Sequence, residues 1–507
     1  MTFTVYEGTI KHELPFGEGD TILAALQSAG IESVTAPCGG KGSCKKCTVF
    51  VRSGEFTGAC LACTTPVREG MAVELEPEIR FSVAESSGAE PWAPTPGQSG
   101  YAAACDVGTT TVVCQLLDLT DGKPLATVSG SNSQRIFGGD VLSRLKAAEE
   151  GHAEELHSQI VTQVNYFLAE LCRKAEISRE ELRRLAVTGN TIMMHLFAGL
   201  DPAQISTAPF TPVSLFGRTL SGRDVGLDFA GEVYLCPAVS GFIGSDVVCG
   251  VLACGMGEKT ANSMLIDLGA NTEIVIGNRE KMTACAVDGG AAFKASLLDH
   301  GMIAAAGAIS GVKREGDELV LEVLGGGRPK GICGSGFIDL LGVLYEEEIL
   351  DEMGRLADPE ETDSPLARYL GEEDGRAVFY LTEDRKLFIS RTDISKFQLA
   401  KAAISAGIQI LGEESGISFA KLDKLALGGG FGAFGHRKNS ALLGIIPRQC
   451  KGKTVKLGNL ALTGAVSAAV SARARSELER LAKIVRVVDL PTHPSFSDAD
   501  TEGMLFE

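Results

Sequence analysis

Hydrophobic and polar residues alternate over short stretches at the start of the chain, as is typical of strands. The alternating stretches are residues 2–9, 47–52 and 71–75. Between them, residues 21–29 predict one short helix, with Asp20 or Thr21 as its N-cap. We therefore expect a small β-rich domain over residues 1–81.

Residues 82–100 have no hydrophobic period, because Ser, Gly, Pro and other small residues dominate. This composition predicts a flexible linker. The linker carries the single tryptophan of the chain, Trp92, for which we expect an ordered contact.

From residue 101 onward, helical periods alternate with short apolar strands. One helical face is formed by Leu156, Ile160, Val164, Phe167, Leu168 and Leu171. Ser178 followed by Glu181 is a capping-box pattern and predicts that the next helix begins there. Residues 185–188 and 425–427 are predicted strands between helices. This alternation predicts an α/β architecture for residues 101–507.

Composition and charge narrow the function classes. The chain has 507 residues, of which 44% are hydrophobic and 22% charged, and its formal net charge is -18. Such acidity argues against nucleic acid as a partner, because phosphates are neutralised by Lys and Arg. Solubility explains the charge, and docking to a basic patch on a partner is the alternative. Residues 1–10 show no signal-peptide pattern and no apolar run reaches 18 residues, so we expect no membrane span and a cytoplasmic location.

Five of the 14 cysteines fall within one short stretch, which favours metal binding over disulfides in such a compartment. They are Cys38, Cys44, Cys47, Cys60 and Cys63. The first three have the spacing C-x5-C-x2-C within a Gly-rich loop, and glycine lets the backbone wrap closely round an inorganic core. The segment resembles [2Fe-2S] ferredoxins of the β-grasp fold. Its first gap is one residue longer than in plant-type ferredoxins, and so resembles the vertebrate type.

Two questions about this cluster stay open from the sequence. Zinc is an alternative metal, since residues 44–47 and 60–63 form two C-x2-C pairs, although Cys38 would then have no role. The fourth ligand is predicted as Cys63, because residues 61–67 resemble the ferredoxin ending in which Leu-x-Cys precedes a Pro; Cys60 is the alternative. The gap after Cys47 is shorter than in plant-type ferredoxins.

Two segments with the same pattern follow apolar strands and are candidates for phosphate binding. Each offers an Asp, a Gly turn and hydroxyl or amide groups, which suit phosphate and Mg2+. The first comprises Asp106, Gly108, Thr109, Thr110 and Thr111, and the second Asp267, Gly269, Asn271 and Thr272. The repeat predicts two similar halves, at about residues 101–260 and 261–507.

A third Gly-rich loop, with Gly428, Gly429 and Gly430, follows the predicted strand 425–427. Two phosphate loops and this later loop, in this order, resemble the superfamily of acetate and sugar kinases, heat-shock chaperones and actin. The resemblance implies a duplicated ribonuclease-H-like ATPase domain that binds ATP and Mg2+. It also implies connecting segments at residues 237–250 and 462–465. Asp246, in the first of these, is a weaker candidate for activating water.

A ferredoxin domain joined to this ATPase resembles the reductive activators of corrinoid proteins. Residues 188–195 and 331–339 also match that family, without a chemical role derived for either. The resemblance implies ATP-dependent one-electron reduction of Co(II) to Co(I) in a corrinoid protein of a methyltransferase system, with an upstream electron donor and a homodimer. Cys38, Cys44, Cys47 and Cys63 would then carry the electron, while Asp106 and Asp267 position Mg2+ and the attacking water.

Three other functions are compatible with the pattern. The first is an ATP-dependent small-molecule kinase with a regulatory cluster. The second is a ferredoxin-type electron carrier whose ATPase-like domain does not hydrolyse ATP. The third is an activator of a radical dehydratase, but such activators generally carry a shared [4Fe-4S] cluster and lack this N-terminal domain.

Overall fold

The computed structural model describes residues 1–506 with short gaps. The residues outside the description are 8–9, 32–33, 35, 37–39, 43–46, 54–57, 76–86, 270, 288–297, 303, 305, 430–436 and 507. Three predicted site residues, Cys38, Cys44 and Gly430, therefore lie outside the described residues. Within the described part, no helix combines the length and the apolar character needed to cross a membrane.

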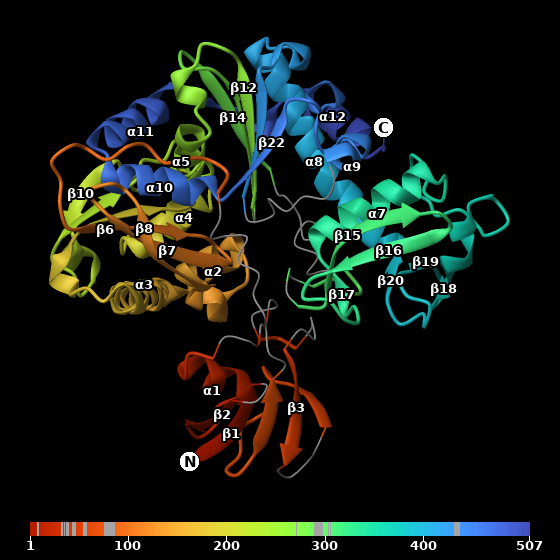
Figure 1. The fold of residues 1–507 in the computed structure, drawn as a ribbon, viewed down its shortest axis with the longest axis horizontal. Helices are drawn as coiled ribbons and strands as arrows, with labels where there is room; N and C mark the ends of the chain where they lie inside the picture. Colours follow the sequence, from red (N-terminus) through yellow and green to blue (C-terminus); the bar gives the residue numbers. More distant parts are fainter. Residues whose placement is uncertain are drawn as a thin grey trace.

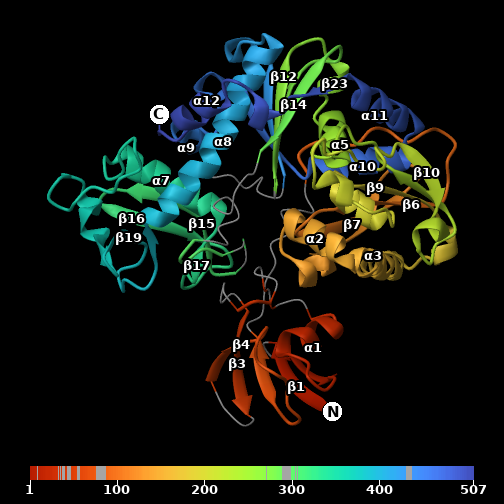
Figure 2. The same ribbon diagram turned by 180° about the vertical axis from the view of Figure 1, so that it is seen from behind.

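The N-terminal domain is a five-stranded sheet with one helix, in the strand order β2-β1-β5-β3-β4. Its elements are β1 (Thr2–Glu7), β2 (Ile10–Pro15), α1 (Ile22–Ser28), β3 (Thr48–Ser53), β4 (Gly58–Leu61) and β5 (Ala72–Leu75). The predicted N-cap Thr21 is confirmed, because its hydroxyl accepts a 3.2 Å hydrogen bond from the Ala24 N–H. Figures 1 and 2 show this domain as a separate lobe below the two larger ones.

The first half of the large region contains a six-stranded sheet in the order β10-β11-β9-β6-β7-β8. Its strands are β6 (Tyr101–Val107), β7 (Thr111–Asp118), β8 (Pro124–Ser131), β9 (Leu182–Thr188), β10 (Arg218–Ser221) and β11 (Glu232–Leu235). Its helices are α2 (Val141–Ala147), α3 (Ala153–Ala175), α4 (Thr191–Phe197) and α5 (Ser245–Ala253). The predicted apolar face of residues 156–171 is buried on α3, as expected.

The prediction of a helix that begins at Ser178 is wrong, because only a single turn forms there. The capping box is present, but it closes a single 3-10 turn, Arg179–Glu181. The chain then enters β9, because Leu185 and Val187 are completely buried in the sheet beside β6. Tertiary burial therefore overrides the local helix signal.

The second half contains another six-stranded sheet, in the order β22-β21-β12-β13-β14-β23. Its strands are β12 (Ser263–Leu268), β13 (Thr272–Gly277), β14 (Met282–Val287), β21 (Lys424–Gly428), β22 (Thr454–Gly458) and β23 (Val485–Val487). Two small sheets are built from β15 (Ala308–Glu315), β16 (Glu318–Val323) and β17 (Gly331–Ile332), and from β18 (Leu370–Glu373), β19 (Arg376–Tyr380) and β20 (Phe388–Ser390). The helices are α7 (Gly334–Glu346), α8 (Arg391–Ser415), α9 (Arg437–Leu442), α10 (Leu460–Val470), α11 (Ala472–Ile484) and α12 (Phe496–Gly503).

The two large sheets share one topology. The strand order β8-β7-β6-β9-β11 in the first corresponds to β14-β13-β12-β21-β22 in the second. In each, the first strand of the half is antiparallel to the next strand and parallel to a later one, β9 or β21. The predicted duplication is thus present in the fold, and the ends of β6 and β12 are equivalent places.

Helices α5 and α10 lie against each other between the two large sheets (Figure 1). They approach so closely that a Cβ at Gly464 would lie 2.4 Å from the Cβ of Cys249. Only glycine fits there. These helices contain or adjoin the connecting segments expected at residues 237–250 and 462–465.

Residues 87–98, which we call the strap, form an ordered part of the segment predicted to be flexible. The Gly88 N–H donates to the Leu457 carbonyl at 2.9 Å, and the Trp92 N–H to the Ser467 hydroxyl at 3.0 Å. The Arg473 guanidinium lies 5.0 Å from the centre of the Trp92 ring. The composition did not predict an ordered strap, because its order comes from contacts with α10 and the residues on either side of that helix. Trp92 makes the ordered contact expected of it.

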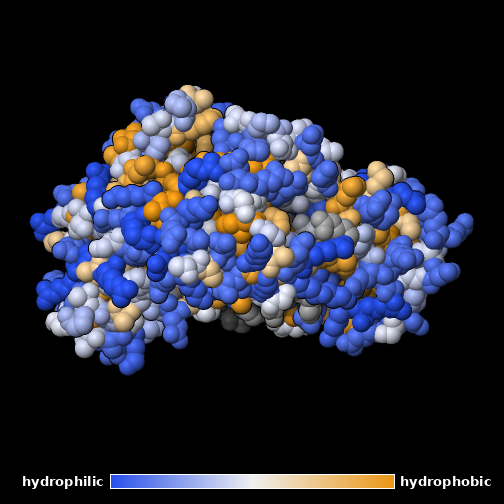
Figure 3. All heavy atoms as spheres, turned by 90° about the horizontal axis from the view of Figure 1, so that it is seen from above, coloured by the Kyte–Doolittle hydropathy of each residue, from blue (hydrophilic) through white to orange (hydrophobic). Residues whose placement is uncertain are grey.

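The surface seen from above is mainly hydrophilic, with hydrophobic side chains in small groups (Figure 3). This agrees with the strongly acidic composition.

Candidate functional site

Two aspartates occupy equivalent positions at the ends of the central strands. Asp106 lies in β6 beside Thr188 of the parallel strand β9. Asp267 lies in β12 beside Gly428 of the parallel strand β21. Ligands of open α/β sheets bind outside the carboxyl ends of parallel strands, so both predicted residues are at the expected edge.

Four carboxyl groups, which we call the acidic cluster, share this region: Asp106, Asp246, Asp267 and Glu273. Burial is the main cause that raises their pKa values, to about 7 for Asp106, about 6 for Asp246 and about 8 for Asp267. The negative charge of Asp246 adds to the effect on the other three. Glu273 lies opposite Asp267 across β12 and β13, and its pKa is raised well above the usual range. A cation placed here would favour the ionised carboxylates.

The acidic cluster does not form a closed metal cage. Among the described residues, no three His, Cys, Asp or Glu side chains converge closely enough to ligate one metal ion. Mg2+ usually keeps several waters and takes only one or two carboxylates together with phosphate oxygens. The donor set therefore fits a hydrated Mg2+ that arrives with a nucleotide.

The carbonyl groups of the first phosphate loop are held by hydrogen bonds from buried side chains and backbone behind it. The carbonyls of Gly108, Thr109 and Thr110 each accept a hydrogen bond, of 2.9, 2.7 and 2.9 Å, from Asn132 or Arg144. Because a planar trans peptide directs its C=O and N–H oppositely, the next N–H groups along the loop point to the other side. Consecutive N–H groups of this kind form an anion site.

The side chains of the first loop differ in exposure. The Thr109 hydroxyl is buried and accepts a 2.9 Å hydrogen bond from the Asn190 amide. Thr110 is exposed and Thr111 partly exposed. At Gly108, a Cβ would lie 2.5 Å from the Thr111 carbonyl oxygen, so the turn requires glycine.

The second phosphate loop also leaves a polar group available. The Gly269 N–H donates to the Asn271 carbonyl at 2.8 Å, which closes a tight turn. The hydroxyl oxygen of Thr272 is buried and has no hydrogen-bond partner in the described part of the chain. A buried hydroxyl without a partner costs about 1–3 kcal/mol, so this orphan fits a ligand such as a phosphate oxygen.

The third loop reaches the same place through Gly428 and Gly429. Gly429 has a φ of 94°, and a Cβ there would lie 2.2 Å from the Leu268 carbonyl oxygen and 2.6 Å from Asp267 Oδ1. Glycine thus lets this loop cross directly over the second phosphate loop. Of the predicted site residues, the structure brings Asp106, Asp246 and Asp267 within electrostatic reach of one another and places Gly429 against Asp267.

Several residues that contact this site were not predicted from the sequence. Asn459 donates a 2.9 Å hydrogen bond to Asp106 Oδ2 and also N-caps α10 through Leu462. Arg144 and Asn132 are completely buried behind the first loop. Asn190 belongs to the matching stretch 188–195, and its cap of α4 was a readable signal. For Arg144, no local pattern indicates the role.

The cysteines of the N-terminal domain were predicted to hold the cluster, and two of them lie side by side. The Sγ atoms of Cys47 and Cys63 are 3.1 Å apart, and both residues are buried. A disulfide would need about 2.05 Å, whereas two thiolates at 2.3 Å from one tetrahedral metal lie about 3.8 Å apart. Cys60 is partly exposed in β4, opposite Val49. At 3.1 Å the two sulfurs are too far apart for a disulfide and closer than two thiolates on one metal, so the structure places these two predicted ligands side by side.

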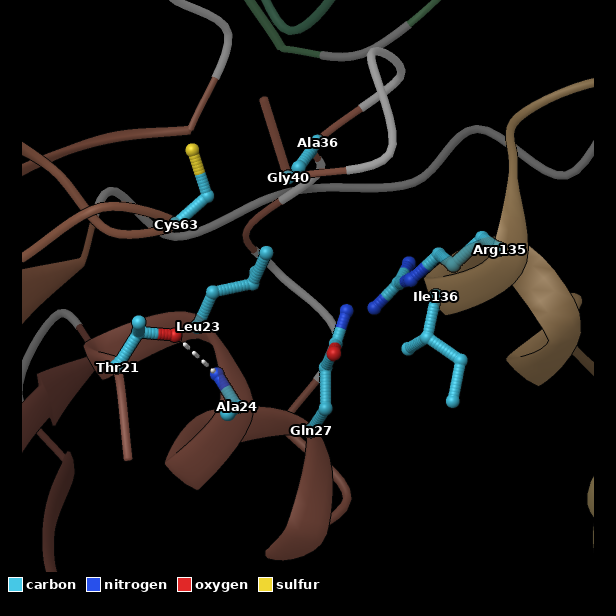
Figure 4. Close-up of a pocket in the computed structure, with 9 residues that line it drawn as sticks. All are labelled: Thr21, Leu23, Ala24, Gln27, Ala36, Gly40, Cys63, Arg135 and Ile136. Carbon is cyan, nitrogen blue, oxygen red and sulfur yellow. Dashed lines mark hydrogen bonds between the residues drawn. The ribbon is translucent and has the colours of Figure 1, made fainter. Parts of the chain in front are cut away.

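Cys63 also faces the first half of the large α/β region. It lines a pocket of about 120 Å³ with Gln27, Gly40, Arg135 and Ile136. Figure 4 shows the Gln27 and Arg135 side chains pointing toward one another from the two sides. Cys63, one of the predicted cluster ligands, therefore lies next to the large α/β region.

Comparison with known families divides the chain into three matched regions. Residues 12–78 match the 2Fe-2S iron-sulfur cluster binding domain, which favours iron over zinc. Residues 101–259 match the RACo middle region, and residues 261–507 match the C-terminal domain of RACo, the ASKHA domain. The fold and the site thus define a [2Fe-2S] protein fused to an actin- and sugar-kinase-like domain.

Individual relatives give the family. The chain is 31% identical over 420 residues to the corrinoid activation enzyme RamQ of Eubacterium limosum, covering 80% of this chain and 70% of the relative. It is 24% identical over 395 residues to the [Co(II) methylated amine-specific corrinoid protein] reductase of Methanosarcina barkeri, covering 71% and 68%. A solved reductive activator for corrinoid, iron-sulfur protein has a TM-score of 0.71 at 26% identity, covering 99% and 98%. The chain belongs to the family of reductive activators of corrinoid proteins.

Proposed function

We propose that this chain uses ATP binding and hydrolysis to deliver one electron to the Co(II) corrinoid of a partner protein, which becomes Co(I). The observation that best supports this proposal is that two features occur in one polypeptide. These are the adjacent cysteines Cys47 and Cys63, and two phosphate loops whose aspartates belong to the acidic cluster. When bound, the cluster supplies the single electron, which an upstream donor replaces.

Energy coupling is required because the reduction is expected to be uphill. Plant-type [2Fe-2S] centres have potentials near about -400 mV, and the corrinoid couple is expected to be lower. Each 59 mV of one-electron mismatch costs about 1.4 kcal/mol. Nucleotide-driven closure of the two halves about α5 and α10 can offset this cost, because it changes the protein's affinity for the two corrinoid states.

The acidic cluster performs the hydrolytic part in this proposal. Asp106 and Asp267 hold the hydrated Mg2+ that accompanies the phosphates. Asp246, with its pKa of about 6, is mostly ionised at neutral pH and accepts a proton from the attacking water. The N–H groups of the first loop and the Thr272 hydroxyl bind phosphate oxygens.

Four cysteines hold the cluster in the same proposal: Cys38, Cys44, Cys47 and Cys63. The partner is a corrinoid protein of a methyltransferase system. We also infer a homodimer and a cytoplasmic location, a compartment in which thiolate ligands remain reduced; sedimentation and fractionation test these.

The decisive test is anaerobic purification followed by iron and sulfide counts and optical spectra of a cob(II)alamin protein during reduction. We expect two irons and two sulfides per chain, and reduction to Co(I) that needs both ATP and Mg2+. Equal reduction without nucleotide would mean a simple electron carrier, and phosphate transfer to a metabolite would mean a kinase. Either result would overturn the proposal.

A further inference from the structure

The 3-10 turn η2 (Ser133–Phe137) connects β8 to α2, and its N-cap Asn132 bonds to the first phosphate loop. On the side of η2 that faces the N-terminal domain, Arg135 and Ile136 line the pocket beside Cys63. Ile136 is 41% exposed, so this apolar side chain is available for contact. On the opposite wall are Leu23 and Gln27 of α1 (Figure 4).

On its other side, η2 is hydrogen-bonded to the first phosphate loop through its N-cap residue, Asn132. Its N–H donates to the Thr110 carbonyl at 2.9 Å, and its side-chain amide donates to the Gly108 carbonyl at 2.9 Å. The Asn132 Oδ1 atom accepts from the Gln134 N–H at 2.9 Å, within the turn itself. One buried side chain thus belongs to both the loop and the turn.

Arg144 of α2 makes a second link of the same kind. Its guanidinium donates to the Thr109 carbonyl at 2.7 Å, to Gln134 Oε1 at 3.4 Å and to the Gly138 carbonyl at 3.1 Å. Arg144 is fully buried, and burial lowers its pKa to about 10, so it remains a cation at neutral pH. Arg144 and Asn132 thus form one buried hydrogen-bond network between the loop and η2, and a fully satisfied buried network is rigid.

We propose that η2 transmits nucleotide occupancy from the first phosphate loop to the N-terminal domain, with Asn132 and Arg144 as positioning residues and Ile136 as the contact. Phosphates bind the N–H side of the loop, while its carbonyl side is fixed to η2. A shift of the loop therefore displaces one wall of the pocket whose opposite wall is formed by α1 and Cys63. This inference depends on nucleotide binding at the loop, which is part of the proposed function.

The test is amide hydrogen exchange of the full cluster-containing protein, with and without a non-hydrolysable ATP analogue and Mg2+. Peptides covering residues 106–111 report nucleotide binding, and peptides covering α1 report the coupling. We expect the exchange of α1 to change about fivefold or more on nucleotide binding, the lower end of typical allosteric coupling. If residues 106–111 become protected and α1 exchanges equally in both states, the coupling is refuted while nucleotide binding stands.

Variants separate coupling from folding. Ile136→Asp should abolish the nucleotide response of α1 while protection at residues 106–111 remains. Leu142→Asp is the matched control, because Leu142 is 70% exposed on neighbouring α2 and takes no part in the pocket; its response should equal that of wild type. Arg144→Lys should retain part of the response that Arg144→Met loses. A full response in both Ile136→Asp and Arg144→Met would also overturn the inference.

Discussion

Asn459 donates its side-chain amide to the carboxylate of Asp106 at 2.9 Å, although 353 residues separate them. Asn459 caps α10 at the end of β22 in the second half, whereas Asp106 belongs to the phosphate loop of the first. The hydrogen bond therefore joins the two halves at the point where phosphates are expected to bind.

Replacing Asn459 by Ala should weaken nucleotide binding by about tenfold, since hydrogen bonds to charged groups contribute roughly 1.5–3 kcal/mol. The bond lowers the pKa of Asp106, so its loss should also raise that pKa further. Calorimetric titration with the ATP analogue measures the affinity. Asn278→Ala is a matched control, because Asn278 donates a 2.9 Å bond to Asn262 at another place. Equal affinity in both variants would show that the interhalf bond has no role in binding.

Cys63→Ser should remove the [2Fe-2S] cluster, whereas Cys60→Ser should keep it. The reason is that Cys63 is buried with its sulfur 3.1 Å from that of Cys47, while Cys60 is partly exposed in β4. Iron and sulfide counts and the visible spectrum of anaerobically purified protein check this. The reverse pattern would assign the fourth ligand to Cys60.

Stability without nucleotide should fall as pH rises from about 4 to about 8. Asp267 has an unfolded pKa of 3.8 and a folded pKa of about 8. Between these pH values the folded state keeps a proton that the unfolded state releases. The contribution of Asp267 to the free energy of unfolding is therefore fully present below about pH 4 and is lost as the pH rises through about 8. The slope for one carboxyl is at most about 1.4 kcal/mol per pH unit.

Asp267→Asn should flatten this pH slope, and urea unfolding at several pH values measures it. Asp498→Asn, at an exposed position of α12, should leave the slope unchanged. An identical slope in wild type and Asp267→Asn would show that this carboxyl ionises normally. ATPase activity should be lost in Asp267→Asn.

Gly464→Ala should separate α5 from α10. The added methyl would lie 2.4 Å from both the Cβ and the carbonyl oxygen of Cys249. Overpacking of this kind costs roughly 1–3 kcal/mol in the free energy of unfolding, and should also weaken nucleotide-dependent reduction. Thermal unfolding compares it with Gly452→Ala, where no atom lies within 4 Å of the new Cβ. A neutral Gly464→Ala would mean that the helices adjust freely.

The sequence predicts those features of the fold and the site that depend on residues close together in the chain. Asp106 and Asp267 stood out because each lies in a short repeated pattern after an apolar strand. Arg144 and Asn459 did not, because their roles depend on contacts with residues far away in the chain. The Ser178 capping box correctly predicts where the turn begins. It does not show that the helix ends after one turn, because the burial of Leu185 in the sheet is a tertiary effect.

The strap fixes one attachment point for the N-terminal domain. Ser87 pairs with Gly458, and the N-terminal sheet ends at Leu75. Twelve Cα–Cα steps join Leu75 to Ser87, so these two residues lie at most about 43 Å apart. In the proposed function, a corrinoid protein therefore has to bring its cobalt within reach of that attachment point, so the short connection itself restricts where a productive encounter can happen.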